Sequence, residues 1–466
     1  MKKLSLFVIL SVAMLATNLF AQSPVRVPVG PPVAVSNQHL TLPRGPLPPA
    51  LTQAPKGSGL HIGQSYDGID FLGSNCDCLP PDTNAAVGNN YVVETVNLQI
   101  RVFDKTTGAI LLDEPLSTFF GVPAGSDPYV LYDDNADRWY VTVIDGPLVG
   151  LLLAVSADGN PLDGFSNIYH ITAGIGGFVP DYPKPGFNKD AIFITYNNFG
   201  NGSAAATIVS IDKTAALSGT LNYFVSTPKF QFRAMPPAQM HNDVTGGVEW
   251  FVSTDGSDTS GNTIRVTMMT NYLSNSPQFT YTSLPVTAYQ SATTADQPGG
   301  SGTVTVFPNT TTTQVHYRNG RLVTAMASGT AADGFVYPKG LYYQISASKK
   351  KIKLLLQGVI DPGPGVAVQM PSVDEDSNGN LGFTWIESSS TEYLTMWVGA
   401  KSKKVSAAQV AAPGGGFFYY SFRLGDYSTI ALDPSDGLTF WAANEYIGAD
   451  GTNDIWLTHL TSFTVQ

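Results

Sequence analysis

Apolar and polar residues alternate in short runs along most of this chain, and turns rich in Asp, Asn and Gly separate the runs. The stretch YVVETVNLQIRVFDKTTGAILLDEPL, from Tyr91, holds two such runs joined by DKTTG. A second pair, GLYYQISASKKKIKLLLQGVI, starts at Gly340 and has a lysine-rich turn. Alternation with a period of two residues, with turn residues at the joints, predicts β-hairpins. No convincing amphipathic helix of three turns follows the N-terminal region, so the sequence predicts an all-β fold.

A similar unit recurs seven times: small or polar residues, an apolar run, a tight turn, and then an apolar or aromatic strand. The copies are PPDTNAAVGNNYVVETVN from Pro80, SDPYVLYDDNADRWYVTV from Ser126, PDYPKPGFNKDAIFITYN from Pro180, QMHNDVTGGVEWFVST from Gln239, VHYRNGRLVTAMAS from Val315, MPSVDEDSNGNLGFTWIE from Met370 and GDYSTIALDPSDGLTFWA from Gly425. Strand-based repeats of this kind are typical of β-propeller blades. We therefore predict a seven-bladed β-propeller over residues 57–466, or six or eight blades if one repeat is misassigned. A strand from near one terminus would complete a blade begun at the other.

The first residues, MKKLSLFVILSVAMLATNLFAQ, combine two lysines, an apolar stretch and a small residue, Ala21. This pattern predicts a signal peptide over residues 1–21, with an uncleaved anchor as the alternative. Residues 22–56 contain nine prolines and no periodic pattern, which predicts a linker or a strap. No later apolar run is long enough to cross a bilayer, so we expect a secreted or periplasmic monomer without membrane insertion.

The net charge is -11 and only 13% of residues are charged. A nucleic-acid partner would need a basic face, so this class of ligand is disfavoured. The two cysteines, Cys76 and Cys78, could pair with each other, remain free or pair with another chain, or bind a metal.

The runs CxCxPPDTNAAVG, DYPKPG and GDYSTIALDPSDGLTFW resemble a widespread, mostly uncharacterised group of secreted bacterial β-propeller proteins. The resemblance covers about Gly73 to Phe463 and implies a secreted propeller without an established reaction. PSDGLTFW and QFRAMP also resemble motifs of sialidase propellers. Both are displaced, since Ser435 stands where an Asp is expected and Arg233 lies in mid-chain instead of the opening blade.

Residues at the start of each repeat should converge on one mouth of a propeller channel. The carboxylates Asp127, Asp181 and Asp426 are therefore candidate catalytic groups. Candidate ligand-binding residues at the same mouth are Asp82, Lys184, His241, His316, Arg423 and Tyr427. The alternative is structural, because an Asp before a strand commonly accepts hydrogen bonds from backbone amides.

The run VDEDSNGNLGFTW places Asp374, Asp376 and Asn378 at the spacing that opens a calcium loop. The later bidentate Glu is missing, since Trp385 occupies its place, so a hairpin turn is the alternative. Calcium is thus the one candidate cofactor, and none is certain. Aromatic residues at comparable places in the repeats should pack between sheets; they are Trp139, Trp250, Trp385, Phe440 and Trp441.

The segment from Gln290 to Gln314 is rich in Gly and Thr, and we expect a long loop across one face, either functional or a tolerated insertion. No local motif of a nucleophilic hydrolase, metalloprotease or nucleotide-binding protein occurs. The sequence therefore favours an extracellular binding module whose ligand is a carbohydrate or a cell-surface protein. The alternative is a glycoside hydrolase or lyase that uses carboxylates at the channel mouth.

Overall fold

The computed structural model describes residues 59–74, 78–172, 179–200, 203–228, 234–254, 259–299, 303–403, 406–418, 423–449 and 454–465. The chain divides into the units Met1–Leu47 and Pro48–Gln466, and every described residue belongs to the second. The expected signal peptide and nearly all of the expected strap therefore lie outside the described residues. Cys78 is disulfide-bonded, and the other cysteine, Cys76, lies outside them.

Strands dominate the described chain, as predicted. The described α-helices are α2 (Leu116–Phe120) and α3 (Lys213–Leu217), and two single 3₁₀ turns, η1 (Pro161–Asp163) and η2 (Ala331–Asp333), accompany them. Among the described residues, no helix has the length and apolar character that crossing a membrane requires.

Three antiparallel sheets each consist of four strands that are consecutive in sequence. The first contains β2 (Asn84–Val87), β3 (Tyr91–Val96), β4 (Gln99–Asp104) and β5 (Ile110–Pro115); the second contains β6 (Tyr129–Asp133), β7 (Arg138–Ile144), β8 (Gly150–Val155) and β9 (Asn167–Thr172); the third contains β24 (Ala367–Glu375), β25 (Leu381–Ser389), β26 (Glu392–Lys401) and β27 (Ser406–Ala412). The predicted DKTTG turn joins β4 to β5, where the Asp104 carboxylate accepts the backbone N–H groups of Thr106 and Thr107. This local bonding fixes the hairpin.

Three further groups of four strands are joined into one 12-stranded sheet. They are β10 (Val179–Phe187), β11 (Ala191–Gly200), β12 (Ser203–Asp212) and β13 (Tyr223–Ser226); β14 (Ala238–Met240), β15 (Glu249–Thr254), β16 (Ser260–Thr270) and β17 (Gln278–Gln290); and β20 (Val315–Arg318), β21 (Arg321–Thr330), β22 (Pro338–Ser348) and β23 (Lys351–Ile360). Parallel pairing links the first strands of the groups, β10 to β14 and β14 to β20. The β22–β23 hairpin is the second one that the sequence predicted, and its turn lysines are exposed.

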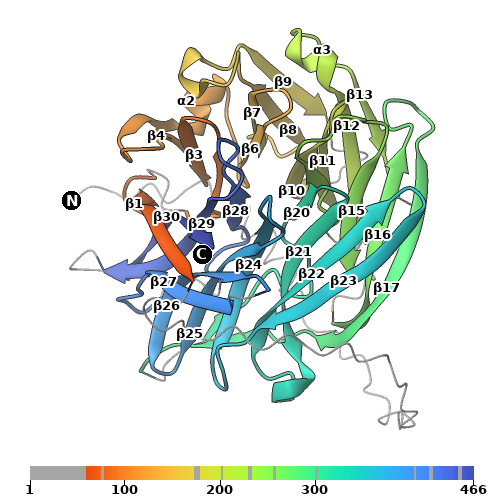
Figure 1. Cartoon of the computed structure of the whole chain (residues 1–466). Coiled ribbons are helices and arrows are strands. Elements are labelled where there is room, and N and C mark those ends of the chain that lie inside the picture. Colours follow the sequence, from red (N-terminus) through yellow and green to blue (C-terminus); the bar gives the residue numbers. More distant parts are fainter. Residues whose placement is uncertain are drawn as a thin grey trace. The chain divides into compact units, whose positions relative to one another are not determined.

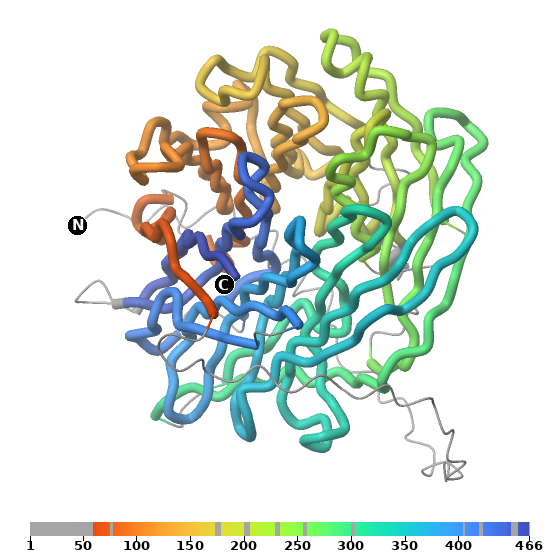
Figure 2. Tube along the Cα trace, viewed as in Figure 1, coloured from red at the N-terminus to blue at the C-terminus, as the bar shows by residue number. Residues whose placement is uncertain are grey.

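The last sheet joins the two ends of the described chain. It contains β28 (Thr429–Leu432), β29 (Phe440–Ala449), β30 (Asp454–Val465) and the N-terminal strand β1 (Leu60–Asp70). β1 pairs antiparallel with β30, from Leu60 opposite Val465 to Asp70 opposite Leu457. Figure 2 shows this orange strand beside the blue C-terminal strands. The expectation that a strand near one terminus completes the last sheet is confirmed.

The first strand of each sheet or group contacts the first strand of the next. This order runs β2, β6, β10, β14, β20, β24 and β28, and β28 returns to contact β2 (Figure 1). We call these strands the inner strands. Antiparallel sheets around a closed ring of inner strands, completed by an N-terminal strand, give the topology of a β-propeller.

Large side chains fill the space between neighbouring sheets. The predicted core aromatics are buried: Trp139, Trp250, Trp385, Phe440 and Trp441 are at most 5% exposed. Gly382 shows how closely they pack, because a Cβ at this position would lie 2.5 Å from the Phe440 ring. Side chains from adjacent sheets interdigitate, so a Cβ there would force repacking.

The segment from Gln290 to Gln314 contains a small hairpin, β18 (Thr294–Asp296) with β19 (Thr303–Thr305). β18 lies against β24 and β25. The Gln297 side chain accepts the backbone N–H of Phe418 at 2.9 Å, and its amide group donates to the Phe418 carbonyl at 3.4 Å. The long segment therefore packs onto distant sheets, as a loop that crosses one face would.

Candidate functional site

The residues that precede the inner strands come together at one end of the ring. Asp82, Asp127 and Asp426 stand just before β2, β6 and β28, and Asp181 lies at the start of β10. Asp127 and Asp426 both raise the pKa of Asp181, which places these carboxyls within electrostatic reach of one another. We call the group the entry cluster; it comprises Asp82, Asp127, Asp181, Lys184, Arg423, Asp426 and Tyr427.

Much of the entry cluster joins neighbouring sheets. Asp127 Oδ2 accepts the backbone N–H of Tyr182 at 3.2 Å and the Tyr427 hydroxyl at 2.8 Å. Asp82 Oδ1 accepts the backbone N–H of Asp426 at 3.1 Å. Each of these bonds connects residues of different sheets. Asp82, Asp127 and Asp426 are at most 7% exposed. Their burial and these bonds fit the alternative that the carboxylates accept backbone N–H groups and have a structural role.

Two asparagines extend this pattern around the ring. Asn97 Oδ1 accepts the backbone N–H of Asp127 at 2.9 Å, and its amide group donates to Asp82 Oδ2 at 2.7 Å. Asn197 Oδ1 accepts the backbone N–H of Ala234 at 3.0 Å. Asp82, Asp127 and Ala234 have φ angles of 58°, 60° and 46°. These φ values lie in the sparsely populated left-handed region. At Asp127 and Ala234, the hydrogen bond from the backbone N–H to an asparagine of the preceding sheet holds this conformation.

Lys184 lies among three tyrosine rings at the centre of the entry cluster. Its Nζ is 3.7 Å from the ring centroid of Tyr427, 4.1 Å from that of Tyr182 and 5.6 Å from that of Tyr129. Burial lowers the pKa of Lys184 to about 7, although the surrounding carboxylates oppose this change. The aromatic faces and the carboxylates together stabilise a cation that is 3% exposed.

Burial raises the pKa of three carboxyls of the cluster, which are Asp82, Asp181 and Asp426. Burial, reinforced by the charges of Asp127 and Asp426, raises the pKa of Asp181 to about 7. Burial also raises the pKa of Asp426 to about 6, although Arg423 opposes the rise. Asp181 is partly exposed, whereas Asp82, Asp127 and Asp426 are buried. It is the one entry carboxyl that combines access with a raised pKa.

An exposed aromatic ring lies beside Arg423, whose charge opposes the rise that burial causes in the pKa of Asp181. Arg423 NH1 donates to both carboxylate oxygens of Asp426 at 2.8 Å, and the guanidinium carbon is 5.0 Å from the Phe307 ring centroid. Phe307 belongs to the long segment after β19 and is 47% exposed. The accessible part of the entry end therefore presents a carboxyl, a guanidinium and an aromatic ring.

The two histidines lie away from the entry cluster, toward the other ends of the inner strands. His241 follows β14, and His316 lies within β20. His241 Nδ1 is 3.1 Å from Asp134 Oδ1, while His316 Nδ1 is 3.6 Å from Asp374 Oδ2. Their ring centroids are 5.8 Å apart. The sequence placed both histidines at the mouth that holds Asp82 and Arg423, and the structure does not bring them there.

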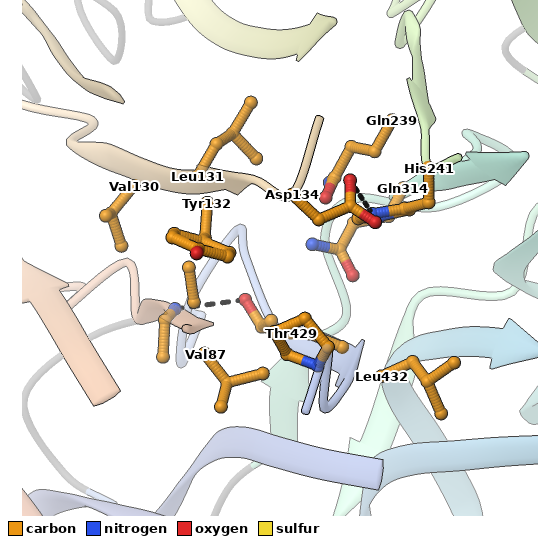
Figure 3. Close-up of a pocket in the computed structure, with 14 residues that line it drawn as sticks. Val87, Val130, Leu131, Tyr132, Asp134, Gln239, His241, Gln314, Thr429 and Leu432 are labelled. Carbon is orange, nitrogen blue, oxygen red and sulfur yellow. Dashed lines mark hydrogen bonds and ion pairs between the residues drawn. The ribbon is translucent and has the colours of Figure 1, made fainter. Parts of the chain in front are cut away.

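A narrow cavity runs beside His241 between the inner strands (Figure 3). It offers about 20 Å³ to the centres of water molecules, enough for about one water. Tyr129, beside Lys184, accepts a hydrogen bond from Gln314 Nε2 at 2.5 Å, and Gln314 lines the cavity. This bond joins the second sheet to the residue just before β20.

The candidate calcium ligands are engaged with protein groups. Asp374 Oδ2 accepts the backbone N–H of Leu432 at 2.9 Å and lies 3.5 Å from the Arg318 guanidinium. Asp376 accepts the backbone N–H of Asn378 and Asn380 in the β24–β25 turn. Within the described ranges, no three His, Cys, Asp or Glu side chains are grouped to hold a metal ion. The turn is a hairpin in which Gly379 has a φ of 82°.

Sequence reasoning missed Phe307, Asn97 and Asn197. The asparagines had a usable signal, because YVVETVN and AIFITYN end the first and third repeats with Asn at the same place. Phe307 had none, since it lies in an irregular segment whose course depends on distant sheets.

No family model matches the chain, and no curated protein matches it. Solved structures are similar only at a distance. A Dyadobacter fermentans protein of unknown function shares 9% identity, with a TM-score of 0.41 over 88% of this chain and 100% of that one. A GH43 endo-arabinanase from Bacillus licheniformis shares 15% identity, with a TM-score of 0.32 over 61% of this chain and 96% of that one. A subtype N10 neuraminidase-like protein of A/little yellow-shouldered bat/Guatemala/060/2010 shares 10% identity, with a TM-score of 0.37 over 70% of this chain and 95% of that one. Similarity this low carries no argument about function.

Proposed function

We propose that this protein is a secreted, seven-bladed β-propeller that binds a carbohydrate at the entry end of its ring. The leader-like pattern of residues 1–21 supports secretion. The ring of inner strands, in which β28 returns to β2 after the six others, supports seven blades. Each inner strand belongs to a set of four strands, and β1 is the fourth strand of the last set.

The observation that carries the proposal is the group formed by Asp181 and Arg423, which are partly exposed, and Phe307, which is exposed. A sugar presents hydroxyl groups and apolar C–H faces. The carboxylate can accept from hydroxyls, the guanidinium can donate to ring oxygens and hydroxyls, and the aromatic ring can stack on the C–H face. The Asp426 carboxylate and the Phe307 ring hold Arg423 in place, which lowers the entropy lost on binding.

A glycan array with the purified full-length protein tests this proposal. We expect binding to a subset of glycans that weakens at least tenfold in Phe307→Ala. Val244→Ala is the matched control, because Val244 is an exposed apolar residue, 77% exposed, in the β14–β15 turn. If no glycan binds, or if both variants weaken binding equally, the carbohydrate proposal is wrong and a cell-surface protein becomes the better candidate ligand.

A second candidate function is glycoside cleavage at the same place. The specific observation in its favour is the pKa of Asp181, about 7, because a carboxyl that is part-protonated at neutral pH can donate a proton to a leaving group. Mass spectrometry of a polysaccharide panel incubated with the protein tests it. Products that appear with the native chain and are absent with Asp181→Asn would support cleavage, whereas an unchanged panel would leave binding as the function.

A further inference from the structure

Two fully buried glutamates lie where the last sheet meets the first, and each bonds to the backbone of the neighbouring sheet. Glu94, on β3, accepts the backbone N–H of Ile69 in β1 at 2.9 Å and the Thr458 hydroxyl in β30 at 2.6 Å. Glu445, on β29, accepts the backbone N–H of Thr83, just before β2, at 3.0 Å. Each sheet therefore supplies one carboxyl to the backbone of the other. We call this junction the closing seam.

Glycine backbone lies close to both carboxyls of the closing seam. A Cβ at Gly68 would lie 2.5 and 2.6 Å from the two Glu94 carboxylate oxygens, and one at Gly425 would lie 2.2 and 2.5 Å from those of Glu445. Both glutamates thus pack directly against glycine backbone. Burial raises the pKa of Glu445, and hydrogen bonding from Thr83 opposes this rise only in part. A buried carboxyl is costly when it is charged and much less so when it carries a proton.

The charged groups around the seam do not compensate for ionisation. Arg101, on β4, faces Glu94, but its guanidinium donates to the Asp113 carboxylate on β5 at 2.7 Å and to the Gly68 carbonyl at 2.9 Å. The charges that face Glu445 are Asp426 and Glu94. Asp82 adds a further carboxyl close to Glu445. Apart from Arg101, these neighbouring charged groups are carboxyls, like the two glutamates themselves.

We propose that the closing seam is a proton-dependent latch, in which Glu94 and Glu445 hold the last sheet, which contains β1, on the first sheet as neutral carboxylic acids and release it when they ionise. The directions of titration agree with this mechanism. Burial raises the pKa of Glu94 from 4.5 to about 7 and that of Glu445 to about 8. A raised carboxyl pKa stabilises the closed form below the unfolded value, and this contribution is lost as the pH rises through 7 and 8.

Hydrogen exchange of the full-length protein, measured by mass spectrometry between pH 6 and pH 9 and corrected for the intrinsic exchange rate, tests the latch. Linkage with the pKa change of Glu94 alone predicts about a tenfold rise in the opening of β1 over this range, and Glu445 adds to it. We expect peptides of β1 to lose protection by at least this factor. The outer strand β23 is the control and should keep its protection.

The variants Glu94→Gln and Glu445→Gln separate the latch from general alkaline loosening. A Gln side chain keeps an oxygen that accepts the Ile69 or Thr83 N–H and cannot ionise. Each single variant should therefore lose the part of the pH dependence that its own glutamate supplies, and the double variant should lose all of it. Equal loss of protection in β1 and β23 of the native protein would overturn the proposal. So would unchanged pH dependence in a folded Gln variant. If one variant fails to fold, the other variant and the native comparison of β1 with β23 still decide the matter.

Discussion

Replacing Asp127 distinguishes a structural carboxyl from a catalytic one. In Asp127→Ala the Tyr182 N–H and the Tyr427 hydroxyl lose their acceptor while both residues stay fully or almost fully buried. A buried donor left without a partner costs about 1–3 kcal/mol, so the two together should lower the free energy of unfolding by about 2–6 kcal/mol. Asp127→Asn keeps an oxygen acceptor, so we expect it to be at least about 2 kcal/mol more stable than the Ala variant.

Urea unfolding followed by tryptophan fluorescence measures this difference, and Asp163→Ala is a control because Asp163 is exposed in η1. A second readout is the pKa of Asp181, which should fall in Asp127→Asn because one of the charges that raise it is gone. If the Ala and Asn variants differ by less than about 1 kcal/mol, Asp127 does not join the sheets as described. Loss of a sugar-releasing activity in a fully stable Asn variant would instead assign Asp127 to catalysis.

Three further predictions concern the fold. Gly68→Ala should lower the stability measured by thermal unfolding by about 1–3 kcal/mol or more, because the added Cβ would overlap Thr458 Oγ1 and the Glu94 carboxylate. Gly415→Ala is the control, because its Cβ enters open space and should leave the stability unchanged. Burial lowers the pKa of His316 from 6.5 to about 4, so the stability that the neutral ring contributes is lost as the pH falls from 6.5 to 4. Thermal unfolding of His316→Gln at several pH values should show a pH dependence that is smaller by about 3 kcal/mol over this range. An unchanged dependence of stability on pH would contradict the burial of a neutral ring. Trp456→Phe removes the indole N–H that donates to the Cys78 carbonyl at 2.7 Å and should cost about 1–3 kcal/mol in urea unfolding; a neutral effect would refute the importance of this bond.

Repetition explains which parts of the structure the sequence predicted. The DKTTG hairpin depends on a turn and its flanking alternation, so local residues determine it. Asp82, Asp127 and Asp426 occupy the same place in their repeats, and equivalent places in a ring of similar sheets lie near one another. The completion of the last sheet by β1 follows from the need to cover an open sheet edge.

Other parts depend on contacts that no repeat encodes. His241 and His316 occur within repeats, but a few residues of difference along an inner strand move a side chain from one end of the ring toward the other. Phe307 reaches Arg423 because the long segment packs across distant sheets through Gln297 and Phe418. Asp374 accepts a hydrogen bond from Leu432 on a distant strand, whereas Asp376 accepts one from Asn378 in its own turn. The calcium-like spacing of the two residues does not predict this difference.

The most direct test of carbohydrate recognition at the entry end is hydrogen-exchange footprinting of the protein with the strongest glycan from the array. We predict that the glycan protects the peptide containing Phe307 and the peptide containing Arg423, and leaves the peptides around His241 unchanged. Protection elsewhere on the molecule, with none at Phe307 or Arg423, would contradict the account.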